Sequence, residues 1–331
     1  MLLSVIIPSY NHEQFVVSAI RAAAKIDIED KEIIVIDDGS RDASVSVIRE
    51  FIGSKGSGSN IRLIARENHG LVKTLNEGLL IARGKYFYVV ASDDIPIPEG
   101  IKSLVRNLEN NEDLQFALGN ALFMNSETQC IFKPAYGESH QRFFALPDDR
   151  RQEEMFLHYP QPILLQATVF KTSTLKEIDG WREDIVSDDF SMFLRLFSRL
   201  NAVGKSFAYQ PEVMTCFYRR HETNISAHLE RQFMTIDQAL THLCPTEWLD
   251  AAYLRNFIGH GITAIKRGEL FLFIHFFRTS VAHIGLLRWL RAASPALLDT
   301  LATSFSRRFA YNVEILVAHE PAITVIAHSY E

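Results

Sequence analysis

Short apolar runs alternate with helical patterns over the first part of the chain, and this alternation constrains the fold more than any other feature. Runs typical of buried strands lie at residues 3–7, 33–36, 61–65 and 86–90. Between them, apolar residues recur with the spacing of amphipathic helices. Because strand–helix–strand units build parallel sheets with right-handed crossovers, we predict an α/β fold with a mostly parallel sheet flanked by helices.

Polar clusters follow three of these predicted strands. They are, in chain order, Ser9-Tyr10-Asn11, Asp37-Asp38 and Asp93-Asp94. The carboxyl ends of parallel strands lie at one edge of a sheet, where ligands bind. Adjacent carboxylates repel unless a cation or a hydrogen-bonding ligand joins them, and a hard divalent metal carrying phosphate oxygens is the usual partner. Asp93 and Asp94 are also typical of a turn, but the convergence of three clusters favours a ligand site.

Composition narrows the class of protein. The 331 residues are 47% apolar and 22% charged, which is typical of a globular protein of one or two domains. A formal net charge of -6 argues against a general nucleic-acid binder. The three cysteines, Cys130, Cys216 and Cys244, are too sparse for a disulfide framework and indicate a reducing compartment. The chain has no signal-like start and no long apolar run, so we expect a cytoplasmic protein.

Residues 98–226 are less regular. We predict a helix at 101–108 and a loop over the site at 138–151. We also predict strands at residues 116–124, 130–133, 167–170, 206–209 and 213–218. Two caps are expected as well: Asn11 before the first helix and Gly84 after the third.

Two later polar clusters each allow two interpretations. Asp188 and Asp189 open a predicted helix, where acids favour the macrodipole, or they hold a catalytic base toward the crevice. Arg219, Arg220 and His221 form either a solvated charged run or a set of ligands for a diphosphate. His221 is also a candidate metal ligand.

The chain from residue 227 onward has a helical pattern. Residues 260–310 contain seven Lys or Arg against two acidic residues and are rich in aromatic side chains. Such a segment is typical of a helix lying on an anionic membrane surface. The alternative is a helical subdomain packed on the catalytic core or on another copy of the chain.

The ordered set of motifs resembles the family-2 glycosyltransferases of the GT-A fold over about residues 1–230. The motifs are Val5-Ile-Ile-Pro-Ser-Tyr-Asn11, Ile33-Ile-Val-Ile-Asp-Asp-Gly-Ser40, Ala91-Ser-Asp-Asp94, Ser187-Asp-Asp189 and Tyr218-Arg-Arg-His-Glu-Thr-Asn-Ile-Ser226. The tail resembles those of bacterial enzymes that build O-antigen or capsular polysaccharide. The resemblance implies a catalytic domain at 1–226, with a nucleotide-sugar half (1–97) and an acceptor half (98–226), and a helical region at 227–331.

The resemblance also implies roles for individual residues. Asp189 resembles the catalytic base, and Asp94 and His221 resemble metal ligands. The expected contacts to the nucleotide sugar come from Pro8, Ser9, Tyr10, Asp37, Asp38, Asn76, Asp93 and Arg220. Two positions depart from the family pattern, because Ala91 replaces an acid and Leu75 replaces an arginine.

The implied activity is that of an inverting, hexosyltransferase-like enzyme that uses Mn²⁺ or Mg²⁺. It would transfer a sugar from a UDP-sugar donor to a hydroxyl of a glycan or polyprenyl-diphosphate-linked sugar, at the inner face of the cell membrane. Two alternatives stay open: a sugar nucleotidyltransferase, and a non-catalytic nucleotide-sugar-binding protein. The helical tail could also mediate a homo-oligomer.

Overall fold

A computed structural model describes residues 1–54, 60–159, 162–221 and 228–292. The chain divides into two compact units. The sheet unit comprises Met1–Ala227 and Gln238–Cys244, and the helical unit comprises His228–Asp237 and Pro245–Glu331. Each unit is described by itself below.

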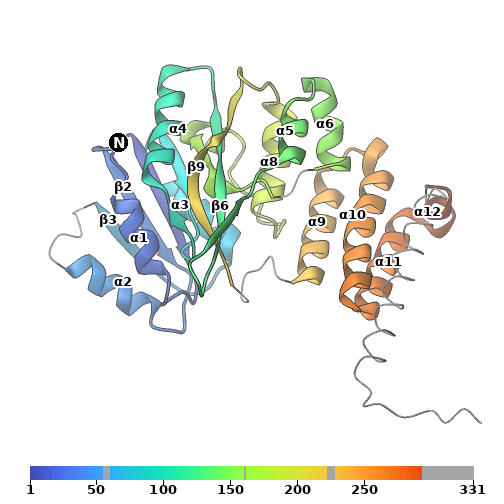
Figure 1. Ribbon diagram of the computed structural model, residues 1–331, viewed down its shortest axis with the longest axis horizontal. Helices are drawn as coiled ribbons and strands as arrows, with labels where there is room; N and C mark the ends of the chain where they lie inside the picture. Colours follow the sequence, from blue (N-terminus) through green and yellow to red (C-terminus); the bar gives the residue numbers. More distant parts are fainter. Residues whose placement is uncertain (55–59, 160–161, 222–227, 293–331) are drawn as a thin grey trace, which may run out of the picture. The chain divides into compact units, whose positions relative to one another are not determined.

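The first half of the sheet unit is the predicted parallel sheet (Figure 1). Its strands are β1 (Leu3–Ser9), β2 (Lys31–Asp37), β3 (Ile61–Ala65) and β4 (Tyr86–Val89), in the spatial order β3-β2-β1-β4. All three neighbouring pairs are parallel, and Ser9 lies opposite Asp37 in the register. The predicted α/β class is therefore confirmed, and the polar residues after β1 and β2 lie side by side.

The second half extends the same sheet through antiparallel and parallel pairs. It contains β5 (Ile95–Pro96), β6 (Phe116–Asn125), β7 (Ile131–Pro134), β8 (Thr168–Lys171) and β9 (Phe207–Arg220). The order continues from β4 through β8, β6, β9 and β5, and β7 pairs with β6. The prediction of separate strands at 206–209 and 213–218 is wrong, because β9 runs through both along β6 with register shifts. The last residues of β9 thereby lie beside Asp93 and Asp94, which follow β4.

Helices cover both faces of the sheet (Figure 1). Helices α1 (Val16–Ala24), α2 (Ser44–Gly53) and α4 (Pro98–Asn110) pack on the face that carries alternate β1 side chains such as Val5 and Ile7. Other helices are α3 (Leu71–Ile81), α7 (Thr172–Glu177) and α8 (Asp189–Arg199). Ile6 points to the opposite face and lies against Gly78 of α3, as the two-residue period of a strand requires.

The predicted loop at 138–151 is wrong. The structure has two short helices there, α5 (Glu138–Phe144) and α6 (Asp148–Leu157). Their buried residues include Phe143, Met155 and Arg151, whose guanidinium donates to the carbonyl oxygens of Phe143 (3.4 Å) and Phe144 (3.2 Å). Helices this short depend on tertiary packing, which a mostly polar sequence pattern does not reveal.

Both predicted caps are also wrong. The first helix is preceded by Phe15, whereas Asn11 adopts a left-handed conformation (φ 55°) and its Oδ1 accepts the Arg41 N–H at 2.8 Å. Asn11 therefore ties the loop after β1 to the loop after β2. The third helix ends at Ile81, and a Cβ on Gly84 would lie 2.4 Å from the Ser4 backbone nitrogen. Close approach of two backbones explains that glycine.

Over residues 228–292, the helical unit confirms the helical pattern predicted from residue 227 onward. Its helices are α10 (Thr246–Arg267), α11 (Leu270–Ile284) and α12 (Leu286–Ala292), with α9 (Leu229–Leu243) divided between the units. Phe257 packs among the rings of Phe273, Phe277 and Trp289. Among the described residues, no helix combines the length and apolar character needed to cross a membrane. The predicted segment 260–310 extends beyond the described residues.

Candidate active site

Two clefts open at the edge of the sheet where β1 and β2 end. The first cleft, of about 480 Å³, is lined by residues that include Tyr10, Asp37, Ser40 and Arg66. The second cleft, of about 920 Å³, is lined by residues that include His12, Phe15, Asp42, Arg220 and His221. Volumes of this size are typical of sites for small molecules and cofactors.

The two acids after β2 have different surroundings. Asp37 accepts hydrogen bonds from the Ser40 N–H (2.9 Å) and the Ser40 hydroxyl (2.7 Å) and lines the first cleft. Asp38 accepts the backbone N–H groups of His69 (2.8 Å) and Gly70 (2.9 Å) and forms an ion pair with Arg66. Asp38 therefore anchors the loop that leads into α3. Its expected contact to the nucleotide sugar stays a prediction.

Of the other residues predicted to bind the nucleotide near the first strand and the third helix, Tyr10 lines the first cleft and the others do not. Tyr10 is 43% exposed and lines the first cleft, whereas Pro8 and Ser9 are buried within β1. Asn76 is engaged elsewhere: its amide donates to the Trp181 carbonyl oxygen and accepts the Trp181 N–H, both at 2.8 Å. Asn76 thus holds the loop before α8 in place in this structure.

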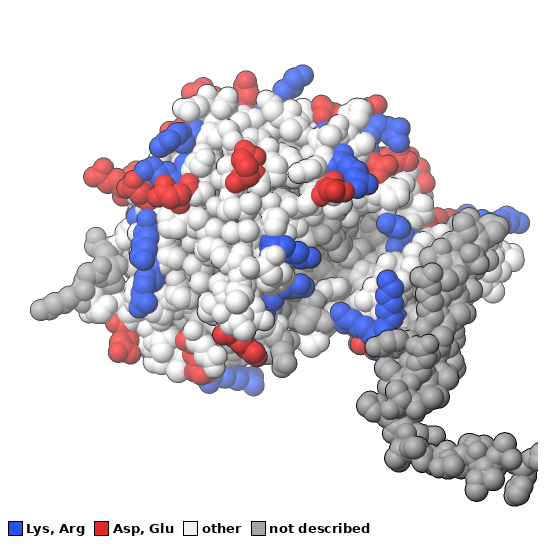
Figure 2. All heavy atoms as spheres, in the orientation of Figure 1, with Lys and Arg blue, Asp and Glu red and all other residues white. Residues whose placement is uncertain are grey.

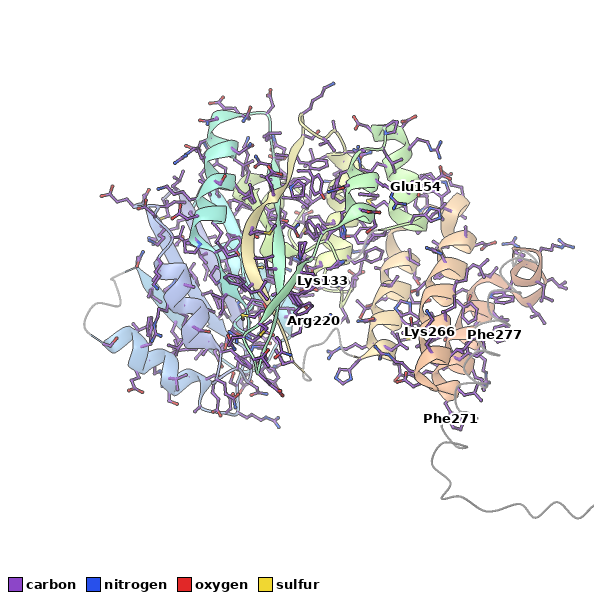
Figure 3. The ribbon with its side chains drawn as sticks, viewed as in Figure 1. Lys133, Glu154, Arg220, Lys266, Phe271 and Phe277 are labelled. Atoms are coloured by element: carbon purple, nitrogen blue, oxygen red, sulfur yellow. The ribbon has the colours of Figure 1, made fainter. Side chains whose placement is uncertain are left out.

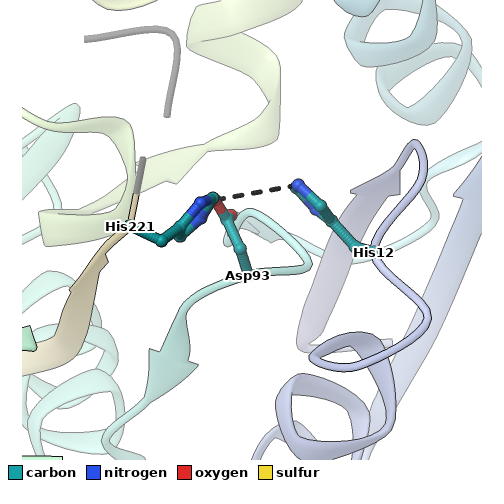
Figure 4. Close-up of side chains that lie close together, drawn as sticks. All are labelled: His12, Asp93 and His221. Carbon is teal, nitrogen blue, oxygen red and sulfur yellow. Dashed lines mark hydrogen bonds and ion pairs between the residues drawn. The ribbon is translucent and has the colours of Figure 1, made fainter. Parts of the chain in front are cut away.

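Three side chains from separate strand ends meet beside the second cleft (Figure 4). His12 follows β1, Asp93 follows β4 and His221 follows β9. Asp93 Oδ2 lies 3.0 Å from His221 Nε2 and 4.0 Å from His12 Nε2. One ligand atom from each residue lies within 4.8 Å of the others, and imidazole nitrogen with carboxylate oxygen is a common donor set for divalent metals. These residues fit a metal site.

Neighbouring groups fix the two imidazoles. His12 Nδ1 lies 2.7 Å from the Ser92 hydroxyl, and the His221 ring stacks on Phe15 with centroids 5.2 Å apart. Burial lowers the pKa of His12, opposed by the negative charge of Asp93. The neutral form of His12, whose ring nitrogen carries a lone pair for a ligand, is therefore favoured.

Asp94 lies deeper than Asp93. Its Oδ1 accepts the Arg219 N–H at 2.8 Å, and its Oδ2 accepts the Gln166 amide at 2.9 Å. Burial raises the pKa of Asp94 well above its ordinary value, and the adjacent charge of Asp93 raises it further. The assignment of Asp94 as a metal ligand stays a prediction, because the carboxylate beside both histidines is that of Asp93.

The two arginines at the end of β9 also differ. Arg219 is 4% exposed, its Nε donates to the Asp93 carbonyl oxygen at 2.7 Å, and its guanidinium lies 4.8 Å from the centre of the Phe15 ring. Arg220 is exposed and lies over the Phe123 ring, as Lys133 does, at 5.0 and 5.8 Å. Figure 3 labels both cations, and Figure 2 shows basic side chains in the same part of the sheet unit.

Asp189 is the first residue of α8. Its Oδ1 accepts the Leu165 N–H at 2.9 Å. Burial raises the pKa of Asp189 well above its ordinary value, and the charges of Asp188 and Asp94 raise it further. A carboxylate with a raised pKa is a stronger base once it is ionised, so this side chain is suited to accept the proton of an acceptor hydroxyl.

Sequence reasoning missed His12, Arg219 and Gln166. His12 directly follows the polar cluster after the first strand, so extending that cluster by one residue would have included it. Arg219 was recognised only as part of a charged run, and the adjacent Arg220 was chosen. Gln166 stands alone between predicted elements, and no local pattern marks it.

Solved structures share this fold. The 1-349 fragment of TarS from S. aureus in complex with UDP-GlcNAc has a TM-score of 0.61 at 18% identity, covering 91% of this chain and 84% of that one. Mannosyltransferase PcManGT from Pyrobaculum calidifontis, in complex with GDP-Man and Mn²⁺, has a TM-score of 0.56 at 15% identity. That match covers 96% of this chain and 88% of PcManGT. Likeness at this identity establishes the GT-A fold.

Part of the chain is similar in sequence to bacterial glycosyltransferases. An uncharacterized glycosyltransferase of Haemophilus influenzae is 38% identical over 130 residues, covering 39% of each chain. Glycosyltransferase GlyG of Streptococcus pneumoniae is 31% identical over 120 residues, covering 36% of this chain and 38% of GlyG. The chain thus spans well under half the length of these curated relatives.

A family profile matches most of the sheet-forming part of the chain. The profile described as glycosyl transferase family 2 matches residues 4–171, which is just over half of the chain. The matched segment includes β1, β2 and β4, with the three polar strand ends of the site. The chain belongs to glycosyl transferase family 2.

Proposed function

We propose that the protein is an inverting glycosyltransferase that transfers a hexose from a UDP-sugar to a hydroxyl of a glycan or lipid-linked glycan. One observation carries the proposal. The metal-binding donor set of His12, Asp93 and His221 lies at the same sheet edge as Asp94, whose charge raises the pKa of Asp189. Ligands for a metal that would neutralise the leaving diphosphate, and a base for the acceptor hydroxyl, would thereby lie at one site.

The first cleft would take the nucleoside, with Asp37 and Tyr10 on its walls. The second cleft would take the diphosphate, near the exposed cation of Arg220. A divalent metal held by His221 and an acid of the Asp93-Asp94 pair would supply neutralisation of the charge that develops on the leaving diphosphate. TarS and PcManGT, which share the fold, were solved with UDP-GlcNAc and with GDP-Man and Mn²⁺, respectively.

Asp189 would act as the base. As the acceptor oxygen attacks the anomeric carbon, its proton moves to the Asp189 carboxylate. The new bond joins the acceptor oxygen to the anomeric carbon, and the bond from that carbon to the diphosphate oxygen breaks. One displacement from the opposite face inverts the anomeric configuration and releases the nucleoside diphosphate.

A donor screen tests this proposal. We expect a UDP-sugar to bind with a dissociation constant that rises at least tenfold when a chelator removes the metal. We also expect transfer of its sugar to a lipid-diphosphate-linked acceptor, with release of UDP. Release of inorganic diphosphate from a nucleoside triphosphate and a sugar phosphate would instead indicate a nucleotidyltransferase. Metal-dependent donor binding without transfer or hydrolysis would indicate a non-catalytic binding protein.

We further propose that the helical unit binds the surface of an anionic phospholipid membrane, where a polyprenyl-linked acceptor for O-antigen or capsular polysaccharide would lie. Phe271 is 91% exposed, and Leu270 (48%) and Ile274 (44%) lie on the same face of α11 by helical spacing. On α12, Leu287 is 73% exposed. Residues 260–292 contain five Lys or Arg against one acidic residue, which complements an anionic surface.

Vesicle co-sedimentation tests the membrane proposal with the full chain. We expect binding to vesicles that contain anionic phospholipid, and at least a fivefold loss in the double variant Phe271→Asp, Leu287→Asp. Leu80→Asp is the matched control, because Leu80 is 79% exposed on α3 of the sheet unit. Equal co-sedimentation of wild type and the double variant would refute the assignment. A concentration-dependent change in mass without vesicle binding would indicate that these helices join copies of the chain.

A further inference from the structure

We infer that His12 is a third protein ligand of the metal. His12 would then complete a site of two imidazoles and one carboxylate that favours first-row transition metals, Mn²⁺ included, over Mg²⁺. This inference rests on the proposed function, because it concerns the metal that would accompany the nucleotide sugar. It adds a ligand from the loop after β1, which none of the family motifs implies.

The distances suit one ion. Ligand atoms about 2.1 Å from a metal lie about 3 Å apart when adjacent and about 4.2 Å apart when opposite. The 3.0 Å separation of Asp93 Oδ2 and His221 Nε2 matches an adjacent pair. The 4.0 Å separation of Asp93 Oδ2 and His12 Nε2 lies between the two values. The widest spacing in the group, within 4.8 Å, closes onto one ion with a shift of less than about 1 Å.

His12 is already oriented for this role. Its Nδ1 lies 2.7 Å from the Ser92 hydroxyl, so the other ring nitrogen is the one toward Asp93. A metal-bound histidine ordinarily has its second nitrogen held by such a neighbour, which fixes the ring orientation. The His12 backbone N–H is also held, by the Ser44 hydroxyl at 3.0 Å. His12 is therefore held at its ring by Ser92, which follows β4, and at its backbone by Ser44, the first residue of α2.

The donor set decides which metal is preferred. Ala91 stands where the resemblance expects an acid, so one hard oxygen ligand is missing from this strand end. His12 would supply a nitrogen ligand from the neighbouring strand end. Mg²⁺ is held by oxygen ligands and water. Mn²⁺ also prefers oxygen ligands, but affinity for a mixed nitrogen and oxygen site rises along the transition series from Mn²⁺ to Co²⁺ and Ni²⁺, and imidazole suits Zn²⁺. Two imidazoles on one ion therefore favour a transition metal over Mg²⁺.

Mn²⁺ binding to the full chain without nucleotide tests the inference. We expect titration followed by electron paramagnetic resonance to show that His12→Ala weakens Mn²⁺ binding at least tenfold. Electron spin-echo envelope modulation should detect two coordinated imidazole nitrogens in the wild type and one in the variant. His158→Ala is the matched control, because His158 is exposed on the sheet unit and paired with Glu154. Circular dichroism checks that each variant is folded.

The outcomes separate this inference from the proposed function. If His12→Ala binds Mn²⁺ as the wild type does while UDP binding still needs the metal, only the role of His12 fails. If Mg²⁺ displaces Mn²⁺ from the wild type at equal concentration, the selectivity fails. If the wild type binds no Mn²⁺ and its UDP binding ignores a chelator, the metal-assisted function fails too. Should His12→Ala not fold, Ser92→Ala takes its place, with an expected loss of Mn²⁺ affinity of about tenfold.

Discussion

Replacing Asp189 by asparagine is expected to lower the rate of sugar transfer by about 10²- to 10⁴-fold, the usual contribution of a general base. Asparagine keeps the size of the side chain and an oxygen that can accept the Leu165 N–H, so the start of α8 should be retained. The variant cannot take the proton of the acceptor hydroxyl. UDP binding in the presence of Mn²⁺ should be unchanged, because the change would remove the proposed base rather than a donor contact.

The same variant has a stability signature that depends on pH. The pKa of Asp189 is raised in the folded chain, mainly by burial, so the native state keeps a proton that the unfolded chain releases as pH rises. Because the unfolded chain ionises Asp189 more readily than the folded chain does, the free energy of unfolding of the wild type falls as pH rises above the ordinary aspartate pKa of about 3.9. The asparagine side chain does not ionise and would carry no such cost. The melting temperature of the variant should match the wild type near pH 3, exceed it as pH rises, and keep a constant lead above the pKa that Asp189 has in the folded chain.

Glu183→Gln is the matched control for both measurements. Glu183 is an exposed acid in the loop before α8, so its replacement should leave the transfer rate and the pH profile of stability unchanged. Transfer by the Asp189 variant at the wild-type rate would show that another group accepts the proton. Loss of UDP binding in that variant would show instead that Asp189 contributes to the donor site.

Much of this site follows from the sequence because strand ends are easy to recognise. The polar residues after β1, β2 and β4 interrupt apolar runs, and parallel pairing then brings them to one edge, as the register of Ser9 with Asp37 shows. Asp189 was placed by family resemblance and not by spacing. The structure adds its raised pKa, which depends on burial by segments distant in the sequence.

The sequence does not distinguish between neighbours in a polar pair. Asp93 and Asp94 are adjacent, yet only Asp93 lies beside both histidines, and Asp94 is held by Arg219 and Gln166. Which member lies beside the histidines depends on how the chain turns after β4, and two adjacent acids indicate a turn without indicating its direction. The helices α5 and α6 were missed for a related reason, since their stability comes from burial of Phe143 and Met155 against other elements.

Arg219 and Arg220 form a second pair of adjacent polar residues whose roles the sequence does not distinguish, and substitutions can separate them. Replacing Arg219 by methionine is expected to lower the free energy of unfolding by about 1.5–3 kcal/mol, because the buried hydrogen bond from the Arg219 Nε to the Asp93 carbonyl oxygen is lost. Arg219 is 4% exposed, and the charges of Asp94 and Asp93 act on it. Without that cation the two buried carboxylates repel each other. Urea denaturation measures the loss, and Arg219→Lys, which keeps the charge but not the Nε donor, should lose less.

Arg220→Met is expected to show the opposite pattern. Arg220 is exposed and lines the second cleft, so its loss should change the free energy of unfolding by less than about 0.5 kcal/mol. The affinity for UDP should nevertheless fall about tenfold or more, because the proposed charged contact to the diphosphate would be removed. Stable Arg219→Met protein together with an unstable Arg220→Met protein would contradict both assignments. Adjacent side chains of a strand point to opposite faces, so one arginine is buried and the other is exposed. The residue type, which is the same at both positions, does not indicate which is which.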